Sequence, residues 1–117
     1  MSKLTALVPV LLLAGCTTTA DMLARAPDYV YESNLSVDGF VACGKGYLVD
    51  GPQVKADQLR VTPLDSGIQQ LEVLGSAADS ILVKVGPNVH GAKVVGYAKN
   101  NSGRTMLFKM SERCGKV

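Results

Sequence analysis

The stretch ILVKVGPNVHGAKVVGYAK, residues 81–99, contains two apolar runs separated by a short polar segment. The first run, 81–85, is rich in β-branched residues and is followed by GPN, a sequence typical of a turn or loop. The second run, 92–99, precedes NNSG at 100–103, which we also interpret as a turn. These features predict two neighbouring β-strands joined by a loop.

Two further apolar runs, 59–62 and 68–74, flank the segment PLDSG at 63–67. The glycine that ends this segment accommodates a positive φ, so the pattern predicts a hairpin. Four short strands on short connections favour an antiparallel sheet, because parallel strands need crossover connections of a dozen or more residues.

Helical spacing appears on both sides of these strands. Residues 37–48 repeat apolar side chains at steps of three and four behind Ser36, which is a suitable N-cap. Residues 105–114 do the same, with Thr105 or Ser102 as the cap. We therefore expect an α+β domain of order α-β-β-β-β-α, in which the N-terminal and C-terminal helices cover one face of a four-stranded antiparallel sheet.

The N-terminus has the pattern of an export signal. Lys3 precedes an uncharged run at 4–13, which is too short to span a bilayer. The run continues into LAGC at 13–16, which resembles the lipobox of bacterial lipoproteins, where the cysteine becomes the lipid-modified N-terminus. The resemblance implies that Cys16 is lipidated, and the alternative is an ordinary secretory signal with an unmodified cysteine.

The chain then divides into three parts. We predict a lipoprotein signal peptide at 1–15, the lipid-anchored cysteine with a flexible tether at 16–34, and a small α+β domain at 35–117. Two or more acyl chains give stable membrane attachment, whereas a single chain is marginal. Because Thr17 rather than an aspartate follows the cysteine, the resemblance implies the bacterial outer membrane, with the domain facing the periplasm.

Two cysteines remain, Cys43 and Cys114, one in each predicted helix. In an oxidising compartment an even pair indicates a disulfide, which would stabilise the domain by roughly 4 kcal/mol. A redox site would favour Cys-x-x-Cys spacing, and a zinc site would need two more ligands when His90 is the single histidine. We therefore predict a structural disulfide and no metal site.

The order of motifs also resembles that of small uncharacterised proteobacterial lipoproteins with a lipobox and a two-cysteine α/β domain. The resemblance implies the fold and the disulfide, and it implies no activity. The sequence differs from that pattern at CGKGYL, residues 43–48, where a tryptophan is missing, so the end of the first helix stays open. The matching residues are Cys16, Cys43, Val61, Pro63, Gly67, Gly91, Tyr97 and Cys114.

No pattern typical of an enzyme is present in the sequence. His90 lies in a predicted loop, the carboxylates are scattered, and neither a G-x-S-x-G elbow nor a phosphate-binding glycine motif occurs. We therefore expect no enzymatic activity, no catalytic residue and no cofactor. Nucleic acid is not an expected partner, because the chain is exported and its basic part has few aromatic residues for stacking on bases.

Charge is distributed unevenly along the chain. Residues 16–80 carry four basic and nine acidic side chains, whereas residues 81–117 carry seven basic side chains and a single acidic one. A basic face would attract anionic lipid or the phosphates of lipopolysaccharide. Alternatively, the two halves interleave in the fold and the charges mix. The candidate residues for anionic-ligand binding are Lys84, Lys93, Lys99, Arg104, Lys109 and Arg113.

Together these features predict a lipoprotein of the bacterial envelope that acts as a non-enzymatic binding or accessory module. Its expected partners are the membrane, through the lipid anchor, and an envelope protein or an anionic envelope component. Two alternatives stay open. One is a periplasmic inhibitor or immunity lipoprotein directed at lysozyme or a toxin, since HGAK at 90–93 faintly matches an inhibitory loop; the other is a minor subunit of an envelope machine.

Overall fold

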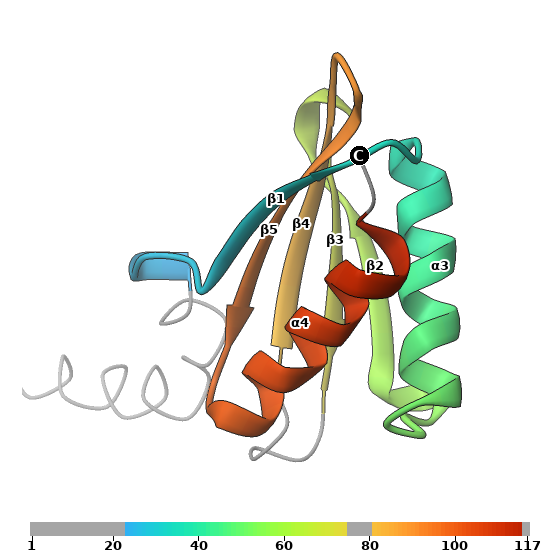
Figure 1. Cartoon of the computed structure of the whole chain (residues 1–117), viewed down its shortest axis with the longest axis vertical. Coiled ribbons are helices and arrows are strands. Elements are labelled where there is room, and N and C mark those ends of the chain that lie inside the picture. Colours follow the sequence, from blue (N-terminus) through green and yellow to red (C-terminus); the bar gives the residue numbers. More distant parts are fainter. Residues whose placement is uncertain (1–22, 75–80, 116–117) are drawn as a thin grey trace, which may run out of the picture.

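The computed structural model describes residues 23–74 and 81–115. It has two layers, a five-stranded antiparallel sheet and two helices, α3 and α4, that lie across one face of that sheet (Figure 1). The strand order is β1-β5-β4-β3-β2, so the last hairpin of the chain forms the centre of the sheet. The predicted α+β class and antiparallel sheet are confirmed, but the predicted number of four strands is wrong.

The central hairpin consists of β4 (Ile81–Asn88) and β5 (Gly91–Ala98). β4 continues through GPN at 86–88, which we had expected to form a loop, and Asn88 pairs with Gly91. β3 begins at Gln69, opposite Val85. The part of β4 beyond Val85 therefore pairs on one side, with β5, and a proline is tolerated there. The loop between the strands is therefore reduced to Val89 and His90.

The predicted hairpin before it is confirmed. It is formed by β2 (Leu59–Pro63), which follows the short 3₁₀ helix η1 (Ala56–Gln58), and by β3 (Gln69–Val73). The connection contains a second 3₁₀ helix, η2 (Asp65–Gly67), whose glycine has a φ of 79°. That positive φ is the conformation for which a glycine was expected in this turn.

The fifth strand, β1 (Tyr29–Ser33), lies in the segment that the sequence analysis assigned to the tether. It pairs with β5, whose sequence lies some sixty residues further on. Asp28 fixes the start of β1, because its carboxylate accepts hydrogen bonds from the Ala98 amide, at 2.7 Å, and from Arg104 Nε, at 3.1 Å. The folded domain therefore includes residues N-terminal to the predicted boundary at 35.

Both helices begin at a capping side chain. α3 (Val37–Asp50) begins after Ser36, whose hydroxyl accepts a hydrogen bond from the Gly39 amide, as predicted. α4 (Asn101–Cys114) begins one turn earlier than predicted, because Asn100 caps it by accepting a hydrogen bond from the Gly103 amide. The prediction of a turn at 100–103 and of a cap at Thr105 or Ser102 is therefore wrong.

The core lies between the helices and the sheet, and a disulfide links the two helices across it. Cys43 in α3 and Cys114 in α4 are bonded, with their Cα atoms 6.0 Å apart, which confirms the predicted pairing. The buried Ser33 hydroxyl donates a hydrogen bond to the Cys114 carbonyl at 2.6 Å, which ties β1 to the end of α4. The buried core residues include Phe40, Leu48, Leu71, Ile81, Val83, Val85, Val94, Leu107 and Met110.

Candidate functional site: the outer face of the sheet

The outer face of the sheet, which points away from α3 and α4, carries side chains that the main core does not use. Strand side chains alternate between the two faces, so every second residue of β4 and β5 points outward. Leu82 and Tyr97 are buried there and form a small cluster with Val95, separate from the main core. The outward residues of the two strands include Leu82, Lys84, Gly86, Lys93, Val95 and Tyr97.

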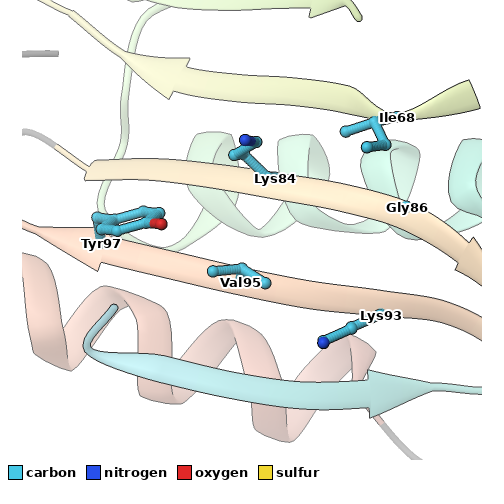
Figure 2. A pocket seen from close by; sticks show the side chains of 6 residues that line it. All are labelled: Ile68, Lys84, Gly86, Lys93, Val95 and Tyr97. Atoms are coloured by element: carbon cyan, nitrogen blue, oxygen red, sulfur yellow. The ribbon is translucent and has the colours of Figure 1, made fainter. Parts of the chain in front are cut away.

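A hollow of about 260 Å³ opens on this face. Gly86 leaves the space, because a Cβ at this position would extend toward Ile68 and lie 3.2 Å from its Cγ1 atom. This volume suits a small molecule or one group of a larger molecule. Its lining consists of Ile68, Lys84, Gly86, Lys93, Val95 and Tyr97 (Figure 2).

The two lysines of the hollow are diagonal neighbours across the central hairpin. Lys84 lies opposite Val95, and Lys93 lies opposite Gly86. Diagonal neighbours in an antiparallel pair lie about 7–8 Å apart, within reach of long side chains. In the described residues, 23–74 and 81–115, neither ammonium group forms an ion pair. The hollow therefore combines an apolar lining with two positive charges.

Glu32 is the acidic residue nearest to these lysines in the strand register, since it lies opposite Lys93 on β1. Its carboxylate already has two partners at the hairpin tip. Asn88 Nδ2 donates a hydrogen bond to Glu32 Oε2 at 3.1 Å, and His90 Nε2 lies 3.8 Å from Glu32 Oε1. Glu32 therefore connects β1 to the hairpin tip and forms no ion pair with Lys93 in the described residues.

No protein-family model matches the chain, and no curated protein or solved structure is significantly similar to it. The resemblance to proteobacterial lipoproteins therefore stays a prediction. Any functional assignment has to rest on the residues of this chain and on their geometry.

A salt bridge between Arg60 and Glu72 flanks the hollow on the same face. Arg60 Nε and a terminal guanidinium nitrogen both donate to Glu72 Oε1, at 3.1 and 3.0 Å. The Glu72 side chain is 4% exposed and the Arg60 side chain 57% exposed. A buried carboxylate needs such a partner, so this pair joins β2 to β3 and Glu72 is engaged in a structural contact.

The remaining predicted basic residues do not line the hollow, and three of them lie on α4, so the six do not form one surface. Lys99 is exposed just after β5, and Arg104 pairs with Asp28 at 3.1 Å. Arg113 on α4 lies 3.5 Å from Asp50 on α3, and Lys109 is exposed on the same helix. Two of the basic side chains thus pair with acidic residues of the N-terminal half. The alternative in which the two halves interleave describes the fold, and it leaves Lys84 and Lys93 together on the outer face.

The crevice between the two helices contains two shallow hollows, and the linings of both include Tyr47, Gly51 and Lys109. Burial raises the pKa of the Tyr47 phenol, and the nearby Arg113 partly opposes this rise. Burial also raises the pKa of Tyr31, whose ring packs against Phe40. Both phenols are therefore neutral at neutral pH, and neither can act as a base there.

The hairpin tip is held by hydrogen bonds to the Asn88 side chain and projects an apolar side chain. Asn88 Oδ1 accepts hydrogen bonds from the backbone amides of His90, at 2.9 Å, and Gly91, at 3.1 Å. Val89 is 93% exposed. His90, the one histidine that the sequence analysis considered, is therefore a partner of Glu32 at a structured turn.

Some of the predicted features lie outside the described residues, and others concern metal ligands and membrane-spanning helices. Cys16 and the predicted signal peptide at 1–15 lie outside the described parts of the chain. Between residues 23 and 115, leaving out 75–80, no three histidine, cysteine, aspartate or glutamate side chains gather as metal ligands. Within the same residues, no helix has the length and apolar character needed to span a membrane.

The sequence analysis named the two lysines but missed the rest of the hollow. Alternation in KVVGYA at 93–98 already puts Lys93, Val95 and Tyr97 on one face, and VKVG at 83–86 does the same for Lys84 and Gly86. Applying the period of two to both strands would have found this group. Ile68 could not be placed, because it lies between η2 and β3 and reaches the hollow through the pairing of β3 with β4.

Proposed function

We propose that the protein is a lipid-anchored lipoprotein of the bacterial envelope, with a non-enzymatic binding module on the periplasmic side of the outer membrane. The observation that carries this proposal is the disulfide between Cys43 and Cys114. Disulfides persist in oxidising compartments such as the periplasm. The lipobox-like LAGC at 13–16 favours the same compartment on independent grounds.

The outer face of the sheet supports a binding role. It offers a hollow bordered by Lys84 and Lys93, whereas Arg104 and Arg113 on α4 are engaged with carboxylates. The carboxylate of Glu72 is engaged with Arg60. A solvent-accessible concave site with a few charged groups on an apolar lining is the usual form of a small-ligand site.

The anchor makes a direct prediction for Cys16. In cells supplied with labelled palmitate, the wild-type chain should incorporate label and sediment with the outer membrane, whereas Cys16→Ser should do neither. Loss of two or more acyl chains removes the hydrophobic burial that attaches the domain to lipid, at about 0.8 kcal/mol per methylene. The measurement is autoradiography of the fractionated envelope together with the intact mass of the purified protein.

A matched control for this experiment is a conservative substitution two residues further on, Thr18→Ser, which keeps the thiol and should be labelled like the wild type. A wild-type chain that is exported, cleaved and free of label would remove the lipoprotein assignment. It would leave the ordinary secretory signal as the reading of residues 1–15.

The hairpin tip favours a second candidate function, inhibition of lysozyme or of a toxin by insertion into its cleft. Val89 is 93% exposed on a turn that Asn88 fixes through two backbone amides. A preorganised apolar tip loses little conformational entropy when it enters a partner's pocket. A fixed, protruding loop is therefore suited to fill a concave site.

This candidate predicts that the purified protein inhibits lysozyme stoichiometrically and that Val89→Asp weakens inhibition by about tenfold or more, which corresponds to about 1.4 kcal/mol. The reason is that a carboxylate would be desolvated without a partner in an apolar pocket. The measurement is the rate of cell-wall lysis against inhibitor concentration, with Lys45→Gln on α3 as the control. Full lysozyme activity at a large molar excess of the protein would remove this target.

A further inference from the structure

We propose that the hollow around Gly86 binds a small amphiphilic anion, a phosphate or carboxylate group carried on a compact apolar body. The inference rests on the proposed function, because it names the ligand class of the binding module. The residues of this binding site lie on the outer face of the sheet, and neither the hairpin tip nor the helices contribute to its lining.

The charge of the ligand follows from the two lysines. Lys84 and Lys93 border the same space as diagonal neighbours, and neither has an ion-pair partner in the part of the chain that the structure describes. Two like charges at such a separation repel each other, and an anion between them adds two attractions that offset this repulsion. Glu32, the closest acidic residue in the register, is engaged by Asn88 and His90. The site therefore selects a ligand with one or two negative charges.

The apolar part of the ligand follows from the rest of the lining. Ile68, Val95 and the Tyr97 ring supply hydrocarbon surface, and Gly86 contributes backbone without a side chain (Figure 2). A strongly hydrated anion such as inorganic phosphate would leave this surface in contact with water. An anion with an apolar body covers it, at about 25 cal/mol per Å² of apolar area removed from water.

The size of the hollow limits that body to about one ring. At about 260 Å³ the space lies just below the usual range for drug-sized ligands, roughly 300–1,000 Å³. A single ring with one anionic group fits this volume, whereas a long acyl chain does not fit within it. Two sources share this chemistry, a free organic anion and the headgroup region of an anionic lipid.

Phenyl phosphate tests the proposal, because it joins a single ring to a phosphate that is largely dianionic at neutral pH. We expect a titration of the ¹⁵N-labelled full-length protein in dodecyl maltoside micelles to shift the amide resonances of Gly86, Lys93 and Val95 in a saturable manner. Inorganic phosphate, which lacks the ring, and benzyl alcohol, which lacks the charge, should each bind at least about tenfold more weakly.

Two kinds of variant separate the apolar from the charged part of the site. Gly86→Leu fills the hollow with a side chain and keeps both lysines, and it should abolish saturable binding of phenyl phosphate. Lys84→Gln with Lys93→Gln keeps the shape and should weaken binding by about tenfold or more. The matched control is Lys45→Gln with Lys55→Gln, which removes the same charge from exposed positions outside the hollow and should leave the dissociation constant unchanged.

Several outcomes would overturn the proposal. They are equal weakening by the control pair, equal binding of inorganic phosphate and phenyl phosphate, and a concentration-dependent dimer that Gly86→Leu disperses. If Gly86→Leu does not fold, as judged by its amide spectrum, the double lysine variant and the comparison of the three probes still decide. Amide shifts confined to the crevice between α3 and α4 would also contradict it.

The source of the ligand is distinguished by a second arm. Flotation of the protein with phosphatidylglycerol vesicles, compared with phosphatidylcholine vesicles, should depend on Lys84, Lys93 and Gly86 if the ligand is a lipid headgroup. No such dependence, together with phenyl phosphate binding, identifies a free organic anion. Because lipidation at Cys16 is read from palmitate labelling, failure of this site would leave the lipoprotein proposal intact, and the reverse also applies.

Discussion

Replacing Cys43 and Cys114 together with alanine should lower the free energy of unfolding by about 4 kcal/mol. The cross-link closes a loop with a sequence separation of 71 residues, which removes conformational entropy from the unfolded chain. Small domains have total stabilities of about 5–15 kcal/mol, so this loss would leave the protein marginally folded at 37 °C. The measurement is urea unfolding followed by circular dichroism, in a Cys16→Ser background that avoids a third thiol.

The disulfide also links the two helices in the folded state, so its removal should loosen the end of α4 in particular. Wild-type protein kept reduced should match the double alanine variant, because both lack the cross-link and differ by little else. Thiol labelling of the unfolded, unreduced wild type should find neither cysteine free. A double variant within about 1 kcal/mol of the oxidised wild type would contradict the entropic account of this bond.

The strands and the first helix could be predicted because their signals are local. The alternation in β4 and β5 and the cap at Ser36 need no knowledge of the tertiary fold. β1 was missed for the opposite reason, since it is stable as an edge strand through pairing with β5, far along the chain. The β-forming residues of its Tyr-Val-Tyr stretch were a usable signal, but the assignment of this segment to a tether hid it.

The start of α4 shows packing overriding a local turn signal. The sequence NNSG favours a turn, yet Asn100 serves as the N-cap and Gly103 is buried in the first turn of the helix. Close packing of a glycine against neighbouring elements can offset the cost of placing it in a helix, which is about 1 kcal/mol relative to alanine. Such an offset depends on tertiary contacts, so the sequence alone could not show it.

The candidate site was predictable in part. Lys84 and Lys93 were named from charge, but their grouping depends on which face of the sheet the helices cover. Once α3 and α4 lie on one face, Arg104, Lys109 and Arg113 follow α4 to that side and the two lysines stay on the other. Charge along the sequence therefore gave the residues, and the layer arrangement decided which of them act together.

A Gly91→Ala substitution should destabilise the protein by about 3 kcal/mol or more, from backbone strain and from overpacking together. Gly91 has a φ of 138°, a conformation that residues with a side chain rarely adopt. A Cβ at this position would lie 2.5 Å from the Leu35 carbonyl oxygen and 2.8 Å from the Ser33 carbonyl oxygen. Both are backbone atoms, so neither can rotate away as a flexible side chain would.

The matched control is Gly46→Ala in α3, where an added Cβ meets no atom within 4 Å. There the alanine should stabilise the protein by up to about 1 kcal/mol, because glycine is a poor helix former. Urea unfolding of both variants measures the contrast. The clash at Gly91 exists because the chain that leaves β1, at residues 33–35, passes directly over the hairpin. A Gly91→Ala protein as stable as the wild type would therefore mean that β1 does not dock there. The pair of substitutions therefore tests the strand that the sequence did not reveal.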